Sequence, residues 1–416
     1  MSTEASLVMG QSFLAQVRKL SRKSARAMII RASRLQEVRP FGKGTNSVCK
    51  LVNHLGYVQI DTISVVQRAH HHVLWSRIPS YKVSHLDLHL ARKRTIFEYW
   101  AHAAAYLPID DYRFTSFTKK YFQSGLDAWP KPDRNMMKWV LTQVKERGPL
   151  MARDFEDSRS SRRGGWWDWK PAKRALERLF LEGALMVSSR KGFQKVYDIP
   201  ERVLPADIDT SQPSDVEYAD HLIDRYLLAN GIGTIPQICY LRRGIKDLVN
   251  KRATQRLQDK DLIALQIEGC GDNIVYSTAD QLEQKHRIPK RLTILSPFDN
   301  ALIQRARIKE LFQYDYKIEC YVPREKRIRG YFCLPLLYGD RFIGCMDAKA
   351  IRSKERLVVR NLCLEKGRDI DLPTESVLID TLIRFAKFNG CKTIGLDDHS
   401  HSNVQELLPF ITRITS

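Results

Sequence analysis

The tripeptide Gln59-Ile60-Asp61 combines the residue types that are best suited to catalysis in this chain. If the segment is extended, Gln59 and Asp61 project to one face, about 6.5–7 Å apart, while Ile60 points into the core. A carboxylate beside an amide can orient a water molecule and can stabilise positive charge that develops on a sugar. An Asp with an ordinary pKa of about 3.9 is already ionised at neutral pH. The structural alternative is that Asp61 caps a helix beginning near Thr62.

A second cluster, from Gly164 to Pro171, places three tryptophans among basic residues. The functional interpretation is a DNA-contacting edge, with a Trp ring stacked on or wedged into the duplex and cations on the phosphates. The alternative is that Trp167 and Trp169 pack in the core and position a helix. The candidate DNA-binding residues of this cluster are Arg162, Arg163, Trp166, Lys170, Lys173 and Arg174.

A third group of cations alternates at strand spacing and consists of Arg324, Lys326, Arg327 and Arg329. We expect Arg324, Lys326 and Arg327 to line a DNA-binding groove. The alternative is a solvated strand edge whose charges prevent pairing with another chain.

The sequence predicts neither a metal site nor a bound cofactor. His70, His71 and His72 are adjacent, and successive side chains on a helix point about 100° apart, so the three cannot chelate one ion together. They are expected to pack or to contact phosphate. The cysteines lack the spacing of a zinc site, and the segment 231–233 lacks the third glycine of a dinucleotide loop.

The net charge of the chain and the length of its apolar runs narrow the choice of partner and location. The 416 residues carry a net charge of +21, which favours an acidic partner, with nucleic acid first and an anionic membrane surface second. No apolar run of about 18 residues is present, so no spanning helix is expected. With no signal peptide expected either, we predict a monomeric protein with reduced thiols in the cytoplasm, associated with the nucleoid.

The periodicity of the chain predicts an α+β protein with three tandem winged helix-turn-helix units and a C-terminal β-barrel. Helix, short helix, basic helix and hairpin follow one another between residues 134 and 199, and the same order repeats between 216 and 277. The expected parts are a basic N-terminal extension (1–23), three winged-helix units (24–125, 126–205 and 206–285) and the barrel with its closing helix (286–416). The extension is either a solvated arm or an arm on the DNA backbone.

The last third of the chain has the composition of strands. The turn residues 338–341 predict a hairpin, and Asn389-Gly390 predicts the end of a helix that begins near Ser376. The expected strands are 292–295, 316–322, 329–338, 341–350 and 356–361.

Several stretches resemble the AlkZ/YcaQ family of bacterial DNA glycosylases, which act on alkylated bases and interstrand crosslinks. The resemblance runs from about Ser24 to about Asp397. The matching stretches are 58–63 (VQIDTI), 97–102 (FEYWAH), 165–171 (GWWDWKP), 295–299 (LSPFD) and 330–337 (GYFCLPLL).

The resemblance implies three tandem winged helices and a β-barrel around duplex DNA. The resemblance implies a catalytic motif of Gln, an apolar residue, then Gln or Asp. The Asp form distinguishes the YcaQ branch, which this chain resembles. By this resemblance Asp61 and Gln59 are the catalytic pair. Relatives are expected to carry Glu at the position where this chain has Ala103.

The resulting hypothesis is a monofunctional DNA glycosylase that acts on double-stranded DNA. It would hydrolyse the N-glycosidic bond of N7-alkylguanine and unhook crosslinked guanines, without metal or organic cofactor. A winged-helix transcriptional regulator without catalysis is the rival hypothesis, and Asp61 is the residue that separates the two. An RNA-binding protein fits less well, because no aromatic signature of an RNA-recognition sheet is present.

Overall fold

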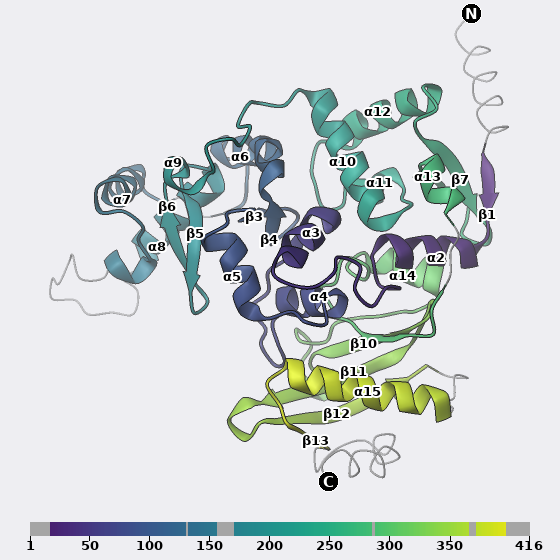
Figure 1. Ribbon diagram of the computed structural model, residues 1–416. Helices are drawn as coiled ribbons and strands as arrows, with labels where there is room; N and C mark the ends of the chain where they lie inside the picture. Colours follow the sequence, from purple (N-terminus) through teal and green to yellow (C-terminus); the bar gives the residue numbers. More distant parts are fainter. Residues whose placement is uncertain (1–16, 130–131, 156–169, 285–287, 366–371, 397–416) are drawn as a thin grey trace, which may run out of the picture. The chain divides into compact units, whose positions relative to one another are not determined.

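The computed structural model describes residues 17–129, 132–155, 170–284, 288–365 and 372–396, which form a mixed α+β fold (Figure 1). The chain divides into two compact units. The first unit consists of Met1–Gly42, Gln59–Ser80 and Ala219–Ser416, and the second of Lys43–Val58 and Tyr81–Tyr218.

The second unit contains short helices around two small sheets. Its helices are α3 (Asn46–Leu55), α5 (Val83–Ala91), η1 (Ile109–Thr115), α6 (Ser116–Gln123), α7 (Arg134–Arg147), η2 (Ala152–Phe155), α8 (Lys170–Glu182) and α9 (Pro200–Val203). Its hairpins are β3 (Ile96–Trp100) with β4 (Ala104–Pro108), and β5 (Met186–Lys191) with β6 (Gln194–Asp198). The short strand β2 (Val58–Gln59) lies where the chain passes from the second unit to the first. It is the neighbour of β4 in a three-stranded sheet of the order β2-β4-β3.

Helix α8 shows how the spacing of apolar residues produces the core of the second unit. Ala175 and Leu176 are fully buried, whereas Lys173 and Arg174 are exposed on the opposite face. The buried face packs on α7, and both helices contribute to one apolar cluster with β5 and β6. The expected order of helix, short helix, helix and hairpin is therefore present, with the short helix in 3₁₀ form.

The first unit combines a helical part with the largest sheet. Its helices are α2 (Arg22–Ala32), α4 (Ala69–Arg77), α10 (Asp215–Asn230), α11 (Ile235–Ile238), α12 (Lys246–Gln258), α13 (Ala279–Glu283), α14 (Arg305–Phe312), η4 (Arg324–Lys326), η5 (Arg352–Lys354) and α15 (Leu372–Phe388). Its strands are β1 (Arg18–Leu20), β7 (Ile263–Ile267), β8 (Ile274–Ser277), β9 (Leu292–Ile294), β10 (Cys333–Tyr338), β11 (Arg341–Ile351), β12 (Arg356–Leu364) and β13 (Thr393–Leu396).

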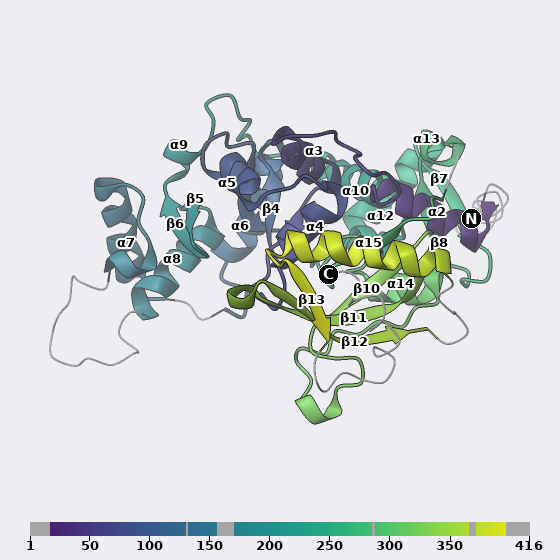
Figure 2. The same ribbon diagram turned by 60° about the horizontal axis from the view of Figure 1, so that its bottom comes forward.

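The expected barrel is, among the described residues, an open five-stranded sheet in the order β13-β12-β11-β10-β9. Strands β9 to β12 are antiparallel, and β13 joins β12 in parallel. Helix α15 lies along one face of the sheet, as Figures 1 and 2 show, and buries Leu378, Leu382 and Phe385 in the core that it shares with the strands.

The prediction of a strand at residues 316–322 is wrong, and the strand expected from Arg329 begins only at Cys333. The backbone N–H groups of Ile328, Arg329 and Gly330 donate to the Glu319 carboxylate rather than to a neighbouring strand. A buried carboxylate thus takes the place of a ladder partner and holds residues 319–331 as a loop.

The N-terminal extension is shorter than expected. Strand β1 pairs in parallel with β7, and Ser21 caps α2 by accepting from the backbone N–H of Ser24. Residues 18–23, which were expected to be loosely ordered, therefore belong to the fold because β7 offers them an edge. Residues 1–16 lie outside the described residues.

Candidate active site

Asp61 begins an irregular segment and caps no helix. The next helix, α4, starts only at Ala69, so the alternative of a helix cap near Thr62 is wrong. Instead, the Asp61 carboxylate oxygen Oδ1 accepts a hydrogen bond from the backbone N–H of Ile63 at 2.7 Å. This local turn orients the carboxylate. Within the described part of the chain, the other oxygen, Oδ2, has no hydrogen-bond donor and is available to a substrate.

The segment that follows Asp61 is fixed against the large sheet of the first unit. The backbone N–H of Ala350 donates to the carbonyl oxygen of Val65 at 2.9 Å, and the N–H of Gln67 donates to Asn389 Oδ1 at 2.7 Å. The side chains of Ile63 and Val65 pack against the core of the sheet. The carboxylate is thus presented from a rigid base, as a catalytic group requires.

The Asp61 side chain is half-buried, and this changes its ionisation. Burial raises the pKa of Asp61 above its ordinary value of 3.8, while the hydrogen bond from Ile63 opposes the increase. The ordinary pKa expected from the sequence is therefore wrong. A carboxylate with a raised pKa is a better proton acceptor than an exposed one.

The pH dependence of the rate should show this shift. If Asp61 acts in catalysis as a carboxylate, kcat/KM should be constant above the pKa of Asp61 and fall about tenfold for each pH unit below it. Because burial raises that pKa, the fall should begin at a higher pH than an exposed Asp would give. Base release measured from pH 4 to 8, after subtraction of acid-catalysed depurination, checks the expectation; an acid limb at or below pH 3.8 would contradict it.

The other two residues of the motif are buried. Ile60 contributes to the core, as expected, and Gln59 ends the short strand β2. Because the strand stops at Gln59, Asp61 lies just outside it. The shared face of Gln59 and Asp61 stays a prediction from the sequence.

The sequence did not identify Cys320 and Tyr321 of the first unit as residues within electrostatic range of Asp61. Partial burial raises the pKa of both side chains, and the negative charge of Asp61 raises it further. Ile318 and Tyr331, at either end of their loop, pack on the same large apolar core as Ile63. The sequence shows an aromatic residue two positions before Pro323 in a basic stretch, but the segment was interpreted as a strand.

The loop that carries Tyr321 is anchored at both ends. The Glu319 carboxylate accepts the N–H groups of residues 328–330 at 2.9, 2.9 and 3.2 Å. The Asp347 carboxylate accepts those of Tyr331 and Phe332 at 3.0 and 3.4 Å. A side chain on Gly330, whose φ is +136°, would collide with Asp347. These contacts fix the base of the loop.

Only some of the candidate DNA-binding residues lie within the described part of the chain. Arg162, Arg163 and Trp166 lie outside the described residues, and the side chain of Lys170, at the start of α8, is likewise not described. Lys173 and Arg174 are exposed on α8 in the second unit.

The cations expected on a strand lie on the loop of residues 319–331 instead. Arg324 and Lys326 are exposed in the turn η4. Arg327 is half-buried, donates to the carbonyl oxygen of Val322 and lies over the ring of Tyr331. The structure therefore places these three cations on one loop of the first unit, and the cations of α8 in the second unit.

The three adjacent histidines are packed rather than exposed to phosphate. All three are buried on α4. His72 contacts the carbonyl oxygen of Ile294 at 2.9 Å, and burial lowers its pKa to about 4. Burial lowers the pKa of His71 to about 3. In the described ranges, no three His, Cys, Asp or Glu side chains are grouped as a metal site.

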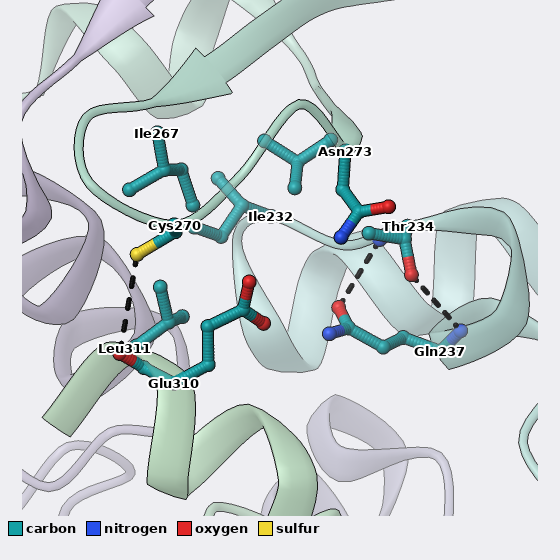
Figure 3. A pocket seen from close by; sticks show the side chains of 9 residues that line it. Ile232, Thr234, Gln237, Ile267, Cys270, Asn273, Glu310 and Leu311 are labelled. Carbon is teal, nitrogen blue, oxygen red and sulfur yellow. Dashed lines mark hydrogen bonds between the residues drawn. The ribbon is translucent and has the colours of Figure 1, made fainter. Parts of the chain in front are cut away.

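The first unit also contains a small cavity of about 20 Å³, enough for roughly one water molecule (Figure 3). Thr234 and Gln237 form a reciprocal capping box on one side of it, and Glu310 comes from α14 on another. The volume is far too small for a nucleobase. The cavity is therefore a packing feature of α11 and α14.

Comparison with known proteins identifies the fold and the family. The family model described as "DNA glycosylase AlkZ-like" matches residues 52–388. The solved structure of the Streptomyces sahachiroi DNA glycosylase AlkZ is similar, with a TM-score of 0.61 and 15% sequence identity over 91% of this chain and 99% of that one. At this identity the structural likeness establishes the fold. None of the described helices is long and apolar enough to span a membrane. Because the family model covers most of the chain, including Asp61, the protein belongs to the AlkZ-like family of DNA glycosylases.

Proposed function

We propose that this DNA glycosylase hydrolyses the N-glycosidic bond of N7-alkylguanine in double-stranded DNA and unhooks crosslinked guanines, acting as a monofunctional, monomeric enzyme. Alkylation at N7 makes the base cationic. The C1′–N9 bond breaks, its electron pair stays on N9 and the base leaves neutral. A water oxygen then bonds to C1′, and the proton of that water passes to the Asp61 carboxylate. The leaving base needs no strong acid or Lewis acid.

The observation that carries the proposal is the state of Asp61. It is half-buried, one oxygen is fixed by Ile63, and the other is available. A fixed negative charge in a partly desolvated position stabilises an oxocarbenium-like sugar more strongly than a mobile one in water. With its raised pKa it can also accept the proton of the attacking water. We assign Gln59 to orienting that water.

The proposed partner is duplex DNA, bound through phosphates. We assign residues 24–125, 126–205 and 206–285 to winged-helix units, because α7 to β6 and α10 to β8 follow the order of that motif. In the third of these, Arg252 and Arg256 on α12 form ion pairs with Asp220 and Asp224 of α10. Their charges are partly neutralised within the fold.

We assign phosphate contacts to Lys173, Arg174, Arg324, Lys326 and Arg327, of which all but Arg327 are exposed, and extend the role of DNA contact from the sequence to Arg162, Arg163, Trp166 and Lys170. Binding through phosphates is independent of sequence, which suits an enzyme that must find damage anywhere.

Binding to undamaged duplex should fall steeply with salt and show no sequence preference. Each neutralised phosphate should contribute about −0.9 to the slope of log K against log salt concentration. Fluorescence anisotropy with random duplexes at 50 to 300 mM salt measures the slope. One operator sequence bound more than about 10³ times better than random DNA would favour the transcriptional regulator.

The direct test incubates the protein with duplex DNA that carries a single N7-methylguanine. We expect abasic sites, detected as alkali-labile strand breaks, and no breaks without alkali. A second substrate with an N7–N7 guanine crosslink should yield single strands on a denaturing gel. If neither substrate reacts while the duplex is bound, the glycosylase proposal is wrong for these lesions.

A further inference from the structure

The loop of residues 319–331 presents two large apolar side chains to solvent. Within the described part of the chain, Ile328 is the most exposed large apolar side chain, at 82%, and Tyr321 is 79% exposed. Exposed apolar side chains are ordinary where they are scattered singly over a surface. Two of them on one short loop indicate an interaction site.

Hydrogen bonds across the loop hold its two arms together. The Glu319 carboxylate, on the first arm, accepts the backbone N–H of Ile328, on the second, at 2.9 Å. Arg327 Nε donates to the carbonyl oxygen of Val322 at 2.8 Å. The residue before Ile328 is therefore bound to the residue after Tyr321, so the two exposed side chains belong to neighbouring backbone positions on opposite arms.

The base of the loop is fixed to the first unit. The Asp347 carboxylate of β11 accepts the backbone N–H groups of Tyr331 and Phe332. The ring of Tyr331 packs on the large apolar core and lies under the guanidinium of Arg327, 4.8 Å from the ring centroid. A loop that is held in this way loses little conformational entropy when it binds a partner.

The charge at the tip of the loop identifies the class of partner. Arg324 and Lys326 are exposed in η4, between the two arms, and neither forms an ion pair with another described residue. Residues 321–330 carry four Lys or Arg and a single acid, Glu325. In the minor groove of DNA, phosphates line both sides, and apolar side chains such as Ile insert between base pairs. Since the family consists of DNA glycosylases, duplex DNA fits this combination of apolar and cationic groups better than a membrane surface does.

We infer that the loop of residues 319–331 is a wedge for duplex DNA, in which Ile328 and Tyr321 enter a base step from the minor groove while Arg324 and Lys326 bind the flanking phosphates. This inference rests on the proposed function, which makes duplex DNA the substrate. Insertion separates two stacked base pairs, so it costs free energy in intact duplex and less where the bases are already unstacked. The loop thereby favours distorted over intact duplex.

The test measures dissociation constants for two undamaged duplexes, one fully paired and one with two adjacent mismatched pairs at its centre. The measured quantities are the ratio of the two constants and the salt dependence of each. Val38→Ser is the control for loss of an exposed apolar side chain, because Val38 is 58% exposed elsewhere in the first unit. The proteins compared with it are wild type, Tyr321→Ser/Ile328→Ser, Ile328→Leu and Arg324→Gln/Lys326→Gln.

We expect wild type to bind the mismatched duplex about 5- to 100-fold more tightly, which corresponds to the cost of unstacking one base step. Tyr321→Ser/Ile328→Ser should bring this ratio close to 1 without changing the salt dependence. Ile328→Leu, which keeps an apolar side chain, and Val38→Ser should keep the ratio. Arg324→Gln/Lys326→Gln should weaken binding of both duplexes equally and reduce the slope of log K against log salt concentration by about 2.

A wild-type ratio of 1 overturns the inference, and so does a ratio that the double serine variant leaves unchanged. If that variant instead loses binding to vesicles of anionic lipid while its DNA affinities stay the same, the loop is a membrane contact and the inference is wrong.

Failure of the proposed function would look different. In that case wild type would leave N7-methylguanine DNA uncleaved, whatever the ratio of the two dissociation constants. Cleavage together with a ratio that does not depend on the loop would reject the wedge alone. Because Tyr321 and Ile328 are exposed, their variants should fold normally, and an unchanged midpoint of thermal unfolding checks that they do.

Discussion

Replacing Asp61 by Asn should reduce the single-turnover rate of base release from N7-methylguanine DNA by about 10²–10⁴-fold. The substitution keeps the shape of the side chain and allows an oxygen to accept from the N–H of Ile63, so the turn should persist. It removes the negative charge that stabilises the sugar cation and the group that accepts the proton of water. Affinity for undamaged duplex should stay within a few-fold, because phosphate contacts come from other residues.

Asp315→Asn is the matched control for that substitution. Asp315 lies in the same unit and forms an exposed ion pair with Lys309. Its loss should leave the rate of base release unchanged, since an exposed pair contributes little. If Asp61→Asn keeps more than half of the wild-type rate, Asp61 has only the structural role of orienting its turn.

The fold was predictable from the sequence where the residues of an element determine its structure locally. The periodicity of residues 134–147 predicted α7, and Gly148 ends it with a φ of +88°. The turn at Gly339 and the helix ending at Asn389 were likewise predicted correctly, because Gly and Asn take left-handed or capping positions that few residues tolerate. Local backbone preference was enough in these places.

The fold was not predictable from the sequence where hydrogen bonds to a distant part of the chain determine the local structure. Residues 316–322 have strand composition, yet the carboxylate of Glu319 binds backbone groups nine to eleven residues away and holds a loop. In the same way, β1 is a strand only because β7 lies beside it. Neither partner can be read from local spacing.

The candidate site shows the same limit. Gln59-Ile60-Asp61 was recognisable as a motif, but the burial that raises the pKa of Asp61 comes from the surrounding fold. The hydrogen bonds that hold the residues after Asp61 come from Ala350 and Asn389, which lie far away in the sequence. A resemblance of motifs can suggest the reaction, whereas the surroundings of the carboxylate depend on such distant partners.

The buried ion pair of Arg77 and Asp299 should matter most for stability. Both side chains are fully buried, and the guanidinium donates to the two carboxylate oxygens at 2.7 and 2.8 Å. Arg77 Nε also donates to the carbonyl oxygen of Ser33 at 2.7 Å. The pair therefore connects the end of α4, the helix that follows the segment of Asp61, with two other parts of the first unit.

Replacing Arg77 by Met should lower the free energy of unfolding by about 3–5 kcal/mol, because it leaves the Asp299 carboxylate buried without a counter-ion. The double variant Arg77→Met/Asp299→Leu should recover most of that loss, since no buried charge then remains. Lys309→Met, which breaks the exposed pair with Asp315, should leave the free energy of unfolding close to that of wild type. Urea denaturation followed by tryptophan fluorescence measures all three, with Trp75 on α4 stacked on Phe388 as a local reporter. A loss for Arg77→Met no larger than that for Lys309→Met, or a double variant less stable than the single one, would show that the pair does not hold this unit together.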